Sequence, residues 1–243
     1  MILATGKAVV IPNFGGSAYS CERHNPLFCV DWVSRNWDTV LWPALRQHIV
    51  LTVIAVAIGF AISTALALAA YRVGWVERPV VVVTLVLYTI PSIALFELLV
   101  GIPWLGLSTA TAEVALVSYT LLILFRNILT GLREVPEEVR DAARGMGMSA
   151  RQMLWRVELP LALPAIIAGL RIATVTVISL ATIAPLISVE SLGTPIFAAI
   201  SNNLFKTELI AAGGMAVLLA VAADGAFVLV QRRLAPWARV RVR

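Results

Sequence analysis

Residues 49–70 read IVLTVIAVAIGFAISTALALAA, an apolar stretch that contains no Asp, Glu, Lys or Arg. A helix rises about 1.5 Å per residue, so a stretch of this length covers the roughly 30 Å hydrocarbon core of a membrane. The whole chain of 243 residues is 60% hydrophobic and 14% charged, with a mean hydropathy of +0.89. Soluble domains carry about 25% charged residues. The composition therefore argues against a water-soluble enzyme, and the net charge of +5 is no evidence of a nucleic-acid partner.

Four further apolar stretches are long enough to cross a membrane as helices. Together with the first stretch they place the spans at about 48–70, 79–100, 110–131, 161–185 and 209–231. Charges are sparse in these spans: the third carries Glu113 and Arg126 near its ends, the fourth carries Arg171 and the fifth carries Asp224. The sequence predicts an all-α membrane protein with about five transmembrane helices and a membrane domain over 47–236.

Basic residues are divided unequally between the two sides of these spans. Thirteen belong to the side that holds the loops 71–78 and 132–160 and the C-terminal tail, against five on the other side. Because loops rich in Lys and Arg remain in the cytoplasm, we expect the N-terminus outside and the C-terminus, with its basic tail 237–243, in the cytoplasm.

Residues 1–46 are expected to form an extracytoplasmic segment without a signal peptide, since no apolar run of sufficient length precedes a cleavage pattern. The tryptophan-rich part, 31–48, is expected to be an interfacial helix that leads into the first span. Cys21 and Cys29 would lie on the oxidising side, where they either form a disulfide or remain two free thiols. Together with His24 they match no common zinc spacing, so no metal site is expected.

The most informative stretch is 134–164, which reads EVPEEVRDAARGMGMSARQMLWRVELPLALP. Pro136 followed by two glutamates predicts the start of a helix, because proline suits the first position and acids suit the positive end of the helix dipole. Gly145 and Gly147 are expected to break this helix. Two short helices around a glycine turn would form either a docking surface or an amphipathic connection between spans.

The second short helix is predicted from Ser149 and Gln152, which have the spacing of a capping box. We expect the pair Leu159–Pro160 to end this helix at the membrane.

These residues resemble the "EAA" loop of permease subunits in bacterial ABC importers. The resemblance rests on Asp141, Ala142, Ala143, Gly147, Val157, Leu159 and Pro160, at the spacing of that motif. Asp141 stands where glutamate is usual, which keeps the charge on a shorter side chain. The resemblance implies a type I ABC importer permease fold. It also implies that 132–160, which we call the coupling loop and which includes Gly145, docks on a cytoplasmic ATP-binding subunit.

Other stretches over about 45–236 resemble the permeases for glycine betaine, carnitine or choline. They are Thr89–Leu95, Leu105–Gly106, Arg126–Asn127, Thr130–Gly131, Gly145–Met148, Glu158–Pro164, Ala168–Arg171 and Leu192–Gly193. Two positions depart from that pattern: Ile123 replaces a common proline, and Glu190–Ser191 replaces a glycine pair. The second departure lies in the outer part of the membrane domain, so it bears on substrate identity.

The chain contains no GxxxxGK[ST] motif, so we expect no ATPase activity and no cofactor in this chain. The resemblance implies that ATP and Mg²⁺ are bound by a separate ATPase subunit. It also implies a second permease subunit, identical or paralogous, and an extracytoplasmic substrate-binding protein. Transport would follow alternating access in a bacterial inner membrane.

Within the coupling loop, the turn at Gly147 is expected to need a small residue and a close backbone approach. Ala142 and Ala143 are expected to face the ATPase groove, where larger side chains would clash. The alternative is that both alanines serve only as good helix formers.

Polar residues within the spans suggest a translocation pathway. Thr89, Pro91 and Ser92 would line it if the proline exposes irregular backbone to a cavity, whereas the alternative is a packed kink. Asn127 is a further candidate, although it could instead bond across helices. Arg171 is expected to extend toward the cytoplasm, and Asp224 to have a structural partner or an exposed position near the inner face.

Three other functions are alternatives. The chain could be an ABC permease for another small solute such as an amino acid, a membrane channel, or a membrane-embedded enzyme. An enzyme would need clustered His, Asp or Glu at membrane depth, and the two histidines, His24 and His48, lie outside or at the boundary.

Overall fold

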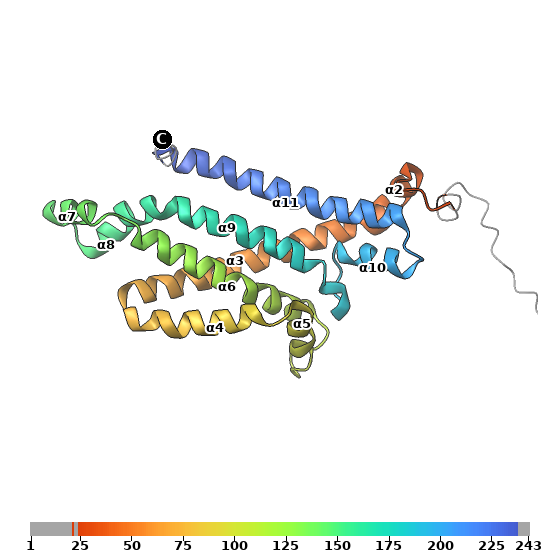
Figure 1. Ribbon diagram of the computed structural model, residues 1–243, viewed down its shortest axis with the longest axis horizontal. Coiled ribbons are helices and arrows are strands. Elements are labelled where there is room, and N and C mark those ends of the chain that lie inside the picture. Colours follow the sequence, from red (N-terminus) through yellow and green to blue (C-terminus); the bar gives the residue numbers. More distant parts are fainter. Residues whose placement is uncertain (1–20, 22–23, 238–243) are drawn as a thin grey trace, which may run out of the picture.

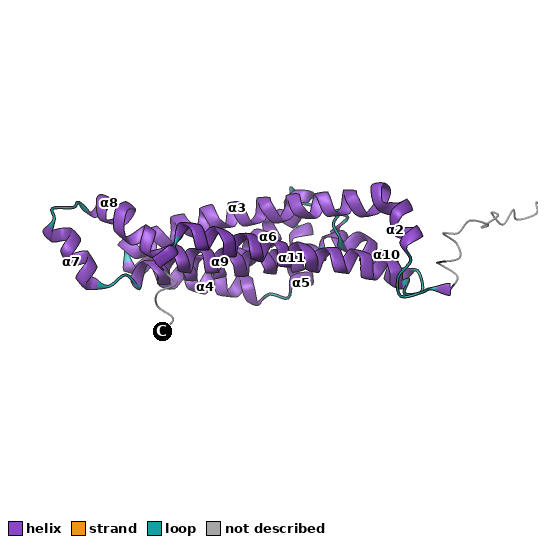
Figure 2. Ribbon diagram, turned by 90° about the horizontal axis from the view of Figure 1, so that it is seen from above, coloured by secondary structure: helices purple, strands orange, loops and turns teal. Residues whose placement is uncertain are grey.

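The computed structural model describes residue 21 and residues 24–237, and within this part all regular structure is helical (Figure 2). The main helices are α2 (Val30–Asn36), α3 (Trp42–Arg72), α4 (Glu77–Thr89), α5 (Ser92–Val100), α6 (Thr109–Arg133), α7 (Glu137–Gly145), α8 (Ala150–Met153), α9 (Leu159–Ala181), α10 (Gly193–Ser201) and α11 (Lys206–Leu234). Short π-helical turns cover Trp37–Leu41 and Leu154–Glu158, and short 3-10 turns cover Gly74–Val76 and Ala184–Ile187.

Four continuous helical stretches are long and apolar enough to cross a membrane: Val30–Arg72, Thr109–Arg133, Ala150–Ala181 and Lys206–Leu234. A fifth crossing requires α4 and α5 together, as one broken span. This agrees with the prediction of about five spans. The helix expected at the interface over 31–48 is continuous with α3, because a π-helical turn joins them without a break.

The second predicted span, 79–100, is not a straight helix. α4 and α5 are bent by 97° at Ile90 and Pro91. Ile90 has an extended ψ of 129°, as the residue before a proline prefers, and Pro91 lacks the N–H that would continue the helix. The Tyr119 hydroxyl on α6 donates a hydrogen bond to the freed carbonyl of Ile90. The break is therefore tolerated at membrane depth because its backbone finds a partner in the protein.

The centre of the bundle depends on close approach of α6 to both α3 and α9 (Figure 1). A Cβ at Gly59 on α3 would overlap the Thr120 side chain, and a Cβ at Gly169 on α9 would lie 2.6 Å from the Asn127 Cβ. Small residues at such crossings allow two backbones to pack closely, which is how helices associate in a membrane without a hydrophobic driving force.

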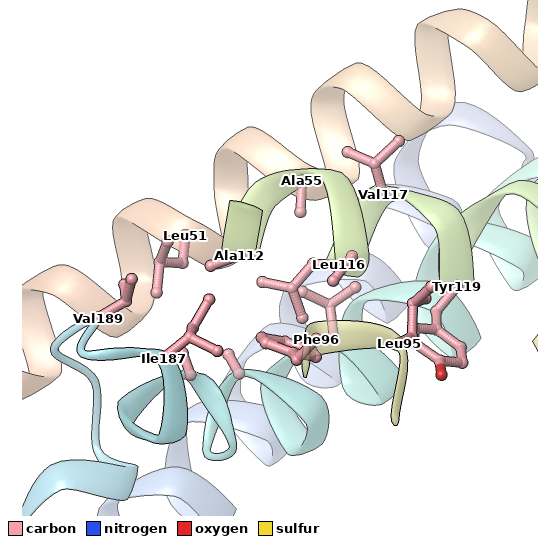
Figure 3. Close-up of a cluster of buried hydrophobic side chains, with 14 of the residues drawn as sticks. Leu51, Ala55, Leu95, Phe96, Ala112, Leu116, Val117, Tyr119, Ile187 and Val189 are labelled. Carbon is pink, nitrogen blue, oxygen red and sulfur yellow. The ribbon is translucent and has the colours of Figure 1, made fainter. Parts of the chain in front are cut away.

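Two buried apolar clusters fill the bundle. One is near α5 and contains Leu51, Phe96, Leu116 and Ile187, which come from α3, α5, α6 and the 3-10 turn after α9 (Figure 3). The other lies toward α7 and contains residues of α3, α6 and α9 such as Phe125. The coupling loop with α7 and α8 projects from one end of the molecule, and α2 and α10 lie at the other end (Figure 1).

Candidate functional site

The coupling loop forms a helical hairpin beyond the end of the bundle (Figures 1 and 2). Pro136 caps α7 with an extended ψ of 140°, and Glu137 and Glu138 occupy the first turn, which confirms the predicted helix start. α7 ends at Gly145, and the carbonyl groups of Ala142, Ala143 and Arg144 accept hydrogen bonds from the residues of the turn that follows.

Two glycines were expected to break the helix. Gly145 is the last residue of α7, and Gly147 makes the turn that follows. Gly147 has a φ of 78°, in the left-handed region, whereas Gly145 has no positive φ. A Cβ at either position would meet nothing within 4 Å, so the close backbone approach expected at Gly147 does not occur within the described residues. The conformation alone requires glycine at 147, because a side chain makes left-handed φ values costly.

The predicted capping box is present at α8. The Ser149 hydroxyl accepts from the Gln152 N–H at 3.3 Å, and the Gln152 side chain accepts from the Ser149 N–H at 2.9 Å. The expected end of this helix at Leu159–Pro160 is wrong, since the helix runs on from Ala150 to Ala181. Pro160 follows a π-helical turn at the beginning of α9, where a missing N–H is tolerated. The second helix of the loop, α8, is thus the N-terminal part of the fourth membrane helix.

The base of the loop contains a buried carboxylate. Glu158 is 2% exposed, and one of its oxygens accepts from the Tyr71 hydroxyl at 2.6 Å and from Arg140 Nε at 3.1 Å. Arg140 Nη2 also donates to the Leu132 carbonyl at 2.8 Å, and its guanidinium lies over the Tyr71 ring, 5.9 Å from the ring centre. We call Tyr71, Leu132, Arg140 and Glu158 the Glu158 cluster. It joins α3, α6, α7 and the start of α9 at one point.

This arrangement fixes α7 to the membrane helices. A buried carboxylate that loses its partner costs about 3–5 kcal/mol, so Arg140 and Glu158 hold each other in place. The sequence did not predict this pair, because the two residues are 18 positions apart and no periodic pattern connects them. The sequence does contain one sign of the pair. Glu158 is an acid directly before Leu159–Pro160, where the chain enters the membrane and a charge without a partner is unfavourable.

A second set of ion pairs lies on the exposed face of α7. Arg144 Nη1 contacts Glu137 at 2.9 Å and Asp141 at 2.8 Å, and all three side chains are more than half exposed. Hydrogen bonds from Arg140 and Arg144 lower the pKa of the Glu137 carboxyl. Exposed pairs of this kind contribute little to stability. Asp141 is therefore presented on the surface, where a partner can reach it.

The two alanines of the motif have different surroundings. Ala142 is exposed, but Ala143 is only 2% exposed. The expectation that both face an ATPase groove is therefore wrong for Ala143, because its side chain is already buried within this chain. Val157, Leu159 and Pro160 are half-buried at the end of the loop.

The four candidate pathway residues do not form one site. Thr89, Pro91 and Ser92 lie together at the break between α4 and α5, where the Thr89 hydroxyl donates to the Val86 carbonyl of its own helix at 2.9 Å. Asn127 lies two turns of α6 away from Tyr119, the residue that binds the break. Its amide donates to the carbonyl of Ile123, on its own helix, at 2.8 Å.

A further polar group lies on α6 near its beginning. Both carboxylate oxygens of Glu113 are buried and have no hydrogen-bond partner among the residues that the structure describes. An unpaired acid at membrane depth is costly. Glu113 is thus a second candidate contact for a polar solute.

Arg171 is paired, and its partner was not predicted from the sequence. Its Nε and Nη2 contact the two oxygens of Asp224 at 2.7 and 2.9 Å, so the pair is bidentate and joins α9 to α11. A charge within a membrane helix gains more from an opposite charge on a neighbouring helix than from a partial reach to the interface. Asp224 has the structural partner expected of it.

At the other end of the molecule, Cys21 and Cys29 are disulfide-bonded in the structure. Asn25, which lies between the two cysteines, attaches this part of the chain to the start of α11. Its side chain accepts from the Lys206 N–H at 2.9 Å and donates to the Leu204 carbonyl at 3.0 Å. Among the described residues, no group of three His, Cys, Asp or Glu side chains could hold a metal ion.

Comparison with solved structures identifies the fold. The permease of the MetNI methionine ABC transporter, in an inward-facing conformation, superposes with a TM-score of 0.73 at 19% identity, covering 81% of this chain and 96% of that one. An amino acid ABC transporter solved with histidines gives a TM-score of 0.71 at 17% identity, covering 85% of this chain and 100% of that one. The fold is that of a type I ABC importer permease.

The family follows from sequence. Residues 57–236 match the family of binding-protein-dependent transport system inner membrane components, and the chain belongs to this family. It is a multi-pass inner-membrane permease subunit of an ABC importer and not an enzyme, since ATP hydrolysis in these systems lies in a separate subunit. Membership also implies an ATP-binding subunit and a substrate-binding protein as partners.

Three curated relatives illustrate the branch of the family. The choline transport system permease protein OpuBB of Bacillus subtilis is 33% identical over 85% of this chain and 94% of its own length. The carnitine transport permease protein OpuCB of Listeria monocytogenes is 36% identical over 78% of this chain and 86% of its own. The osmoprotectant import permease protein OsmW of Salmonella typhimurium is 38% identical over 73% and 84%.

We predict that Arg140→Met lowers the stability of the permease by about 3 kcal/mol, because it leaves Glu158 buried without its cation. The matched control is Arg144→Met, which removes only exposed pairs and should cost less than about 1 kcal/mol. Thermal unfolding of the purified permease in detergent measures both. Equal melting temperatures for the two variants would contradict the role given to the Glu158 cluster.

Gly147→Val should reduce solute-stimulated ATPase activity of the assembled transporter several-fold, because valine is strained at a φ of 78°. Gly145→Val is the comparison, since that position has an ordinary φ and open space around it in this chain, and its activity should fall less than that of Gly147→Val. If both variants were equally active, the turn would not depend on glycine.

Ala142→Leu should leave the melting temperature of the permease unchanged but reduce co-purification of the ATP-binding subunit, because Ala142 is exposed where that subunit would dock. Ala143→Leu should instead destabilise the permease itself by about 1–3 kcal/mol through overpacking. Normal assembly and transport by the Ala142→Leu variant would favour the view that the alanine is only a helix former.

Proposed function

We propose that this permease imports osmoprotectants of the glycine betaine, choline and carnitine type. The observation that carries the proposal is the similarity to relatives named for choline, carnitine and osmoprotectant transport, which extends over 73–85% of the chain. The methionine and amino acid transporters share the fold at under 20% identity, so they carry no argument about the solute.

The loop geometry supports a coupling role for 132–160. The exposed face of α7 presents Asp141 and Ala142 for docking, while the Glu158 cluster attaches the opposite side of α7 to three membrane helices. When the ATP-binding subunits, which hold ATP and Mg²⁺, close around nucleotide, they would displace the loop and the membrane helices together. The permease would then alternate between inward-open and outward-open states, each stabilised by different contacts with the ATPase.

The orientation that fits this role places the coupling loop and the C-terminus in the cytoplasm and the N-terminus outside. The excess of basic residues at the loop end supports this orientation. The disulfide at the opposite end also supports it, because disulfides persist on the oxidising side of the membrane.

The solute pathway would pass the break between α4 and α5. Thr89, Pro91 and Ser92 supply irregular backbone and hydroxyl groups there, and Glu113 supplies an unpaired carboxylate near the outer end of α6. A quaternary ammonium solute carries a positive charge that an acid can attract. A second permease subunit, identical or paralogous, would complete the transporter.

The test is uptake of labelled glycine betaine, choline and carnitine in high-salt medium, in cells whose only osmoprotectant carrier is this chain with its ATPase and binding protein. Uptake of at least one of the three should exceed that of cells lacking the chain about tenfold or more, and Gly147→Val should abolish most of it. If none of the three entered while a labelled amino acid did, the permease would stand and the osmoprotectant would be wrong.

A further inference from the structure

A pocket of about 520 Å³ lies where α4 begins and α6 ends, at the end of the bundle that carries the coupling loop. Three arginines surround it: Arg78 from α4, and Arg126 and Arg133 from α6. Apolar side chains of both helices, among them Val82 and Phe125, form the rest of its wall. The pocket is thus basic on one side and apolar on the other.

The charges of this pocket are unbalanced. Arg133 forms a bidentate pair with Glu77, with contacts of 2.6 and 3.0 Å. Arg78 and Arg126 are exposed, and neither makes a hydrogen bond or ion pair with any residue of the described part of the chain. The single carboxylate therefore neutralises one guanidinium and leaves two available for an anion.

The position of the pocket indicates what kind of anion fits. Trp75, in the turn that precedes α4, is 76% exposed, as expected of a residue at a membrane interface. From the pocket toward the membrane centre, α4 presents the exposed apolar side chains of Val82, Val83 and Val86, which are 55–59% exposed. An occupant that satisfies both parts has an anionic head and an apolar tail.

We propose that this pocket binds the headgroup phosphate of an anionic phospholipid of the cytoplasmic leaflet, with an acyl chain lying along α4. Guanidinium groups bind phosphate oxygens in a bidentate manner, and basic pockets between membrane helices on the cytoplasmic side suit anionic lipid headgroups. An acidic segment of a partner protein would satisfy the arginines but leave the valines of α4 uncovered. The lipid therefore fits the pocket better, and the site does not depend on which solute is transported.

The experiment is native mass spectrometry of the assembled transporter in detergent, titrated with phosphatidylglycerol or with phosphatidylcholine of the same acyl chains. The test variant is Arg78→Gln with Arg126→Gln. The matched control is Arg72→Gln with Arg233→Gln, which removes two exposed arginines at the same end of the bundle but outside the pocket. Inorganic phosphate, added alone at millimolar concentration, serves as the probe for a free anion.

The wild-type and control assemblies should bind phosphatidylglycerol at least about tenfold more tightly than phosphatidylcholine, and the test variant should lose about tenfold in affinity for phosphatidylglycerol. Arg78→Lys with Arg126→Lys should be intermediate, since it keeps the charge but not the bidentate geometry. If the transporter that carries both Arg78→Gln and Arg126→Gln did not assemble, the single variants Arg126→Gln and Arg72→Gln would be compared instead. The first should then lose affinity for phosphatidylglycerol and the second should not.

Three results would overturn the proposal. Equal affinity of the test and control variants for phosphatidylglycerol would mean that the pocket is not the lipid site. Phosphate that competes with phosphatidylglycerol at equal affinity would make it a site for free anions. Dissociation of the assembly in the test variant, with lipid binding unchanged, would make the pocket an interface between proteins.

Discussion

The buried carboxylate of Glu158 is the constraint on which the arrangement of the loop depends. A charge that is 98% buried at the edge of a membrane bundle requires a cation and hydrogen bonds, and Arg140 and Tyr71 supply them. Because Arg140 also binds the Leu132 carbonyl, this single contact ties the loop helix α7 to the ends of α3, α6 and α9. A force applied to α7 is therefore delivered to three membrane helices together.

The same reasoning explains the two irregular features of the membrane domain. The backbone of a membrane helix can break only where the freed groups find partners in the protein. At Ile90 and Pro91 that partner is the Tyr119 hydroxyl. Likewise, Arg171 can lie within a membrane helix because Asp224 meets it from α11. Each irregularity is thus paired with a contact from another helix, and each contact helps to determine how the helices are arranged.

Much of the fold could be predicted from the sequence, because it follows from local properties. Apolar length determines the spans, Pro136 and the acids after it determine the start of α7, and Ser149 with Gln152 determines the capping box. One wrong prediction is local: Leu159–Pro160 was expected to end a helix, yet a π-helical turn carries the helix through it. The other features that the sequence did not predict depend on contacts between distant residues, such as the partner of Arg171, Asp224, which is 53 residues away and gives no local signal. Ala143 was expected on the surface, although only the packing of the hairpin determines which alanine is covered. The Glu158 cluster went unnoticed for the same reason.

The central claim is that α7 and the membrane helices move as one body. Spin labels at Glu138→Cys on α7 and Arg72→Cys at the end of α3, in the assembled transporter with its native disulfide intact, would measure this by pulsed electron paramagnetic resonance with and without ATP. The account predicts one narrow distance that is the same in both states, and a broad distribution when Arg140→Met is added. A label separation in the otherwise unmodified permease that changes with ATP would show that the loop moves independently of the bundle, and would contradict the account.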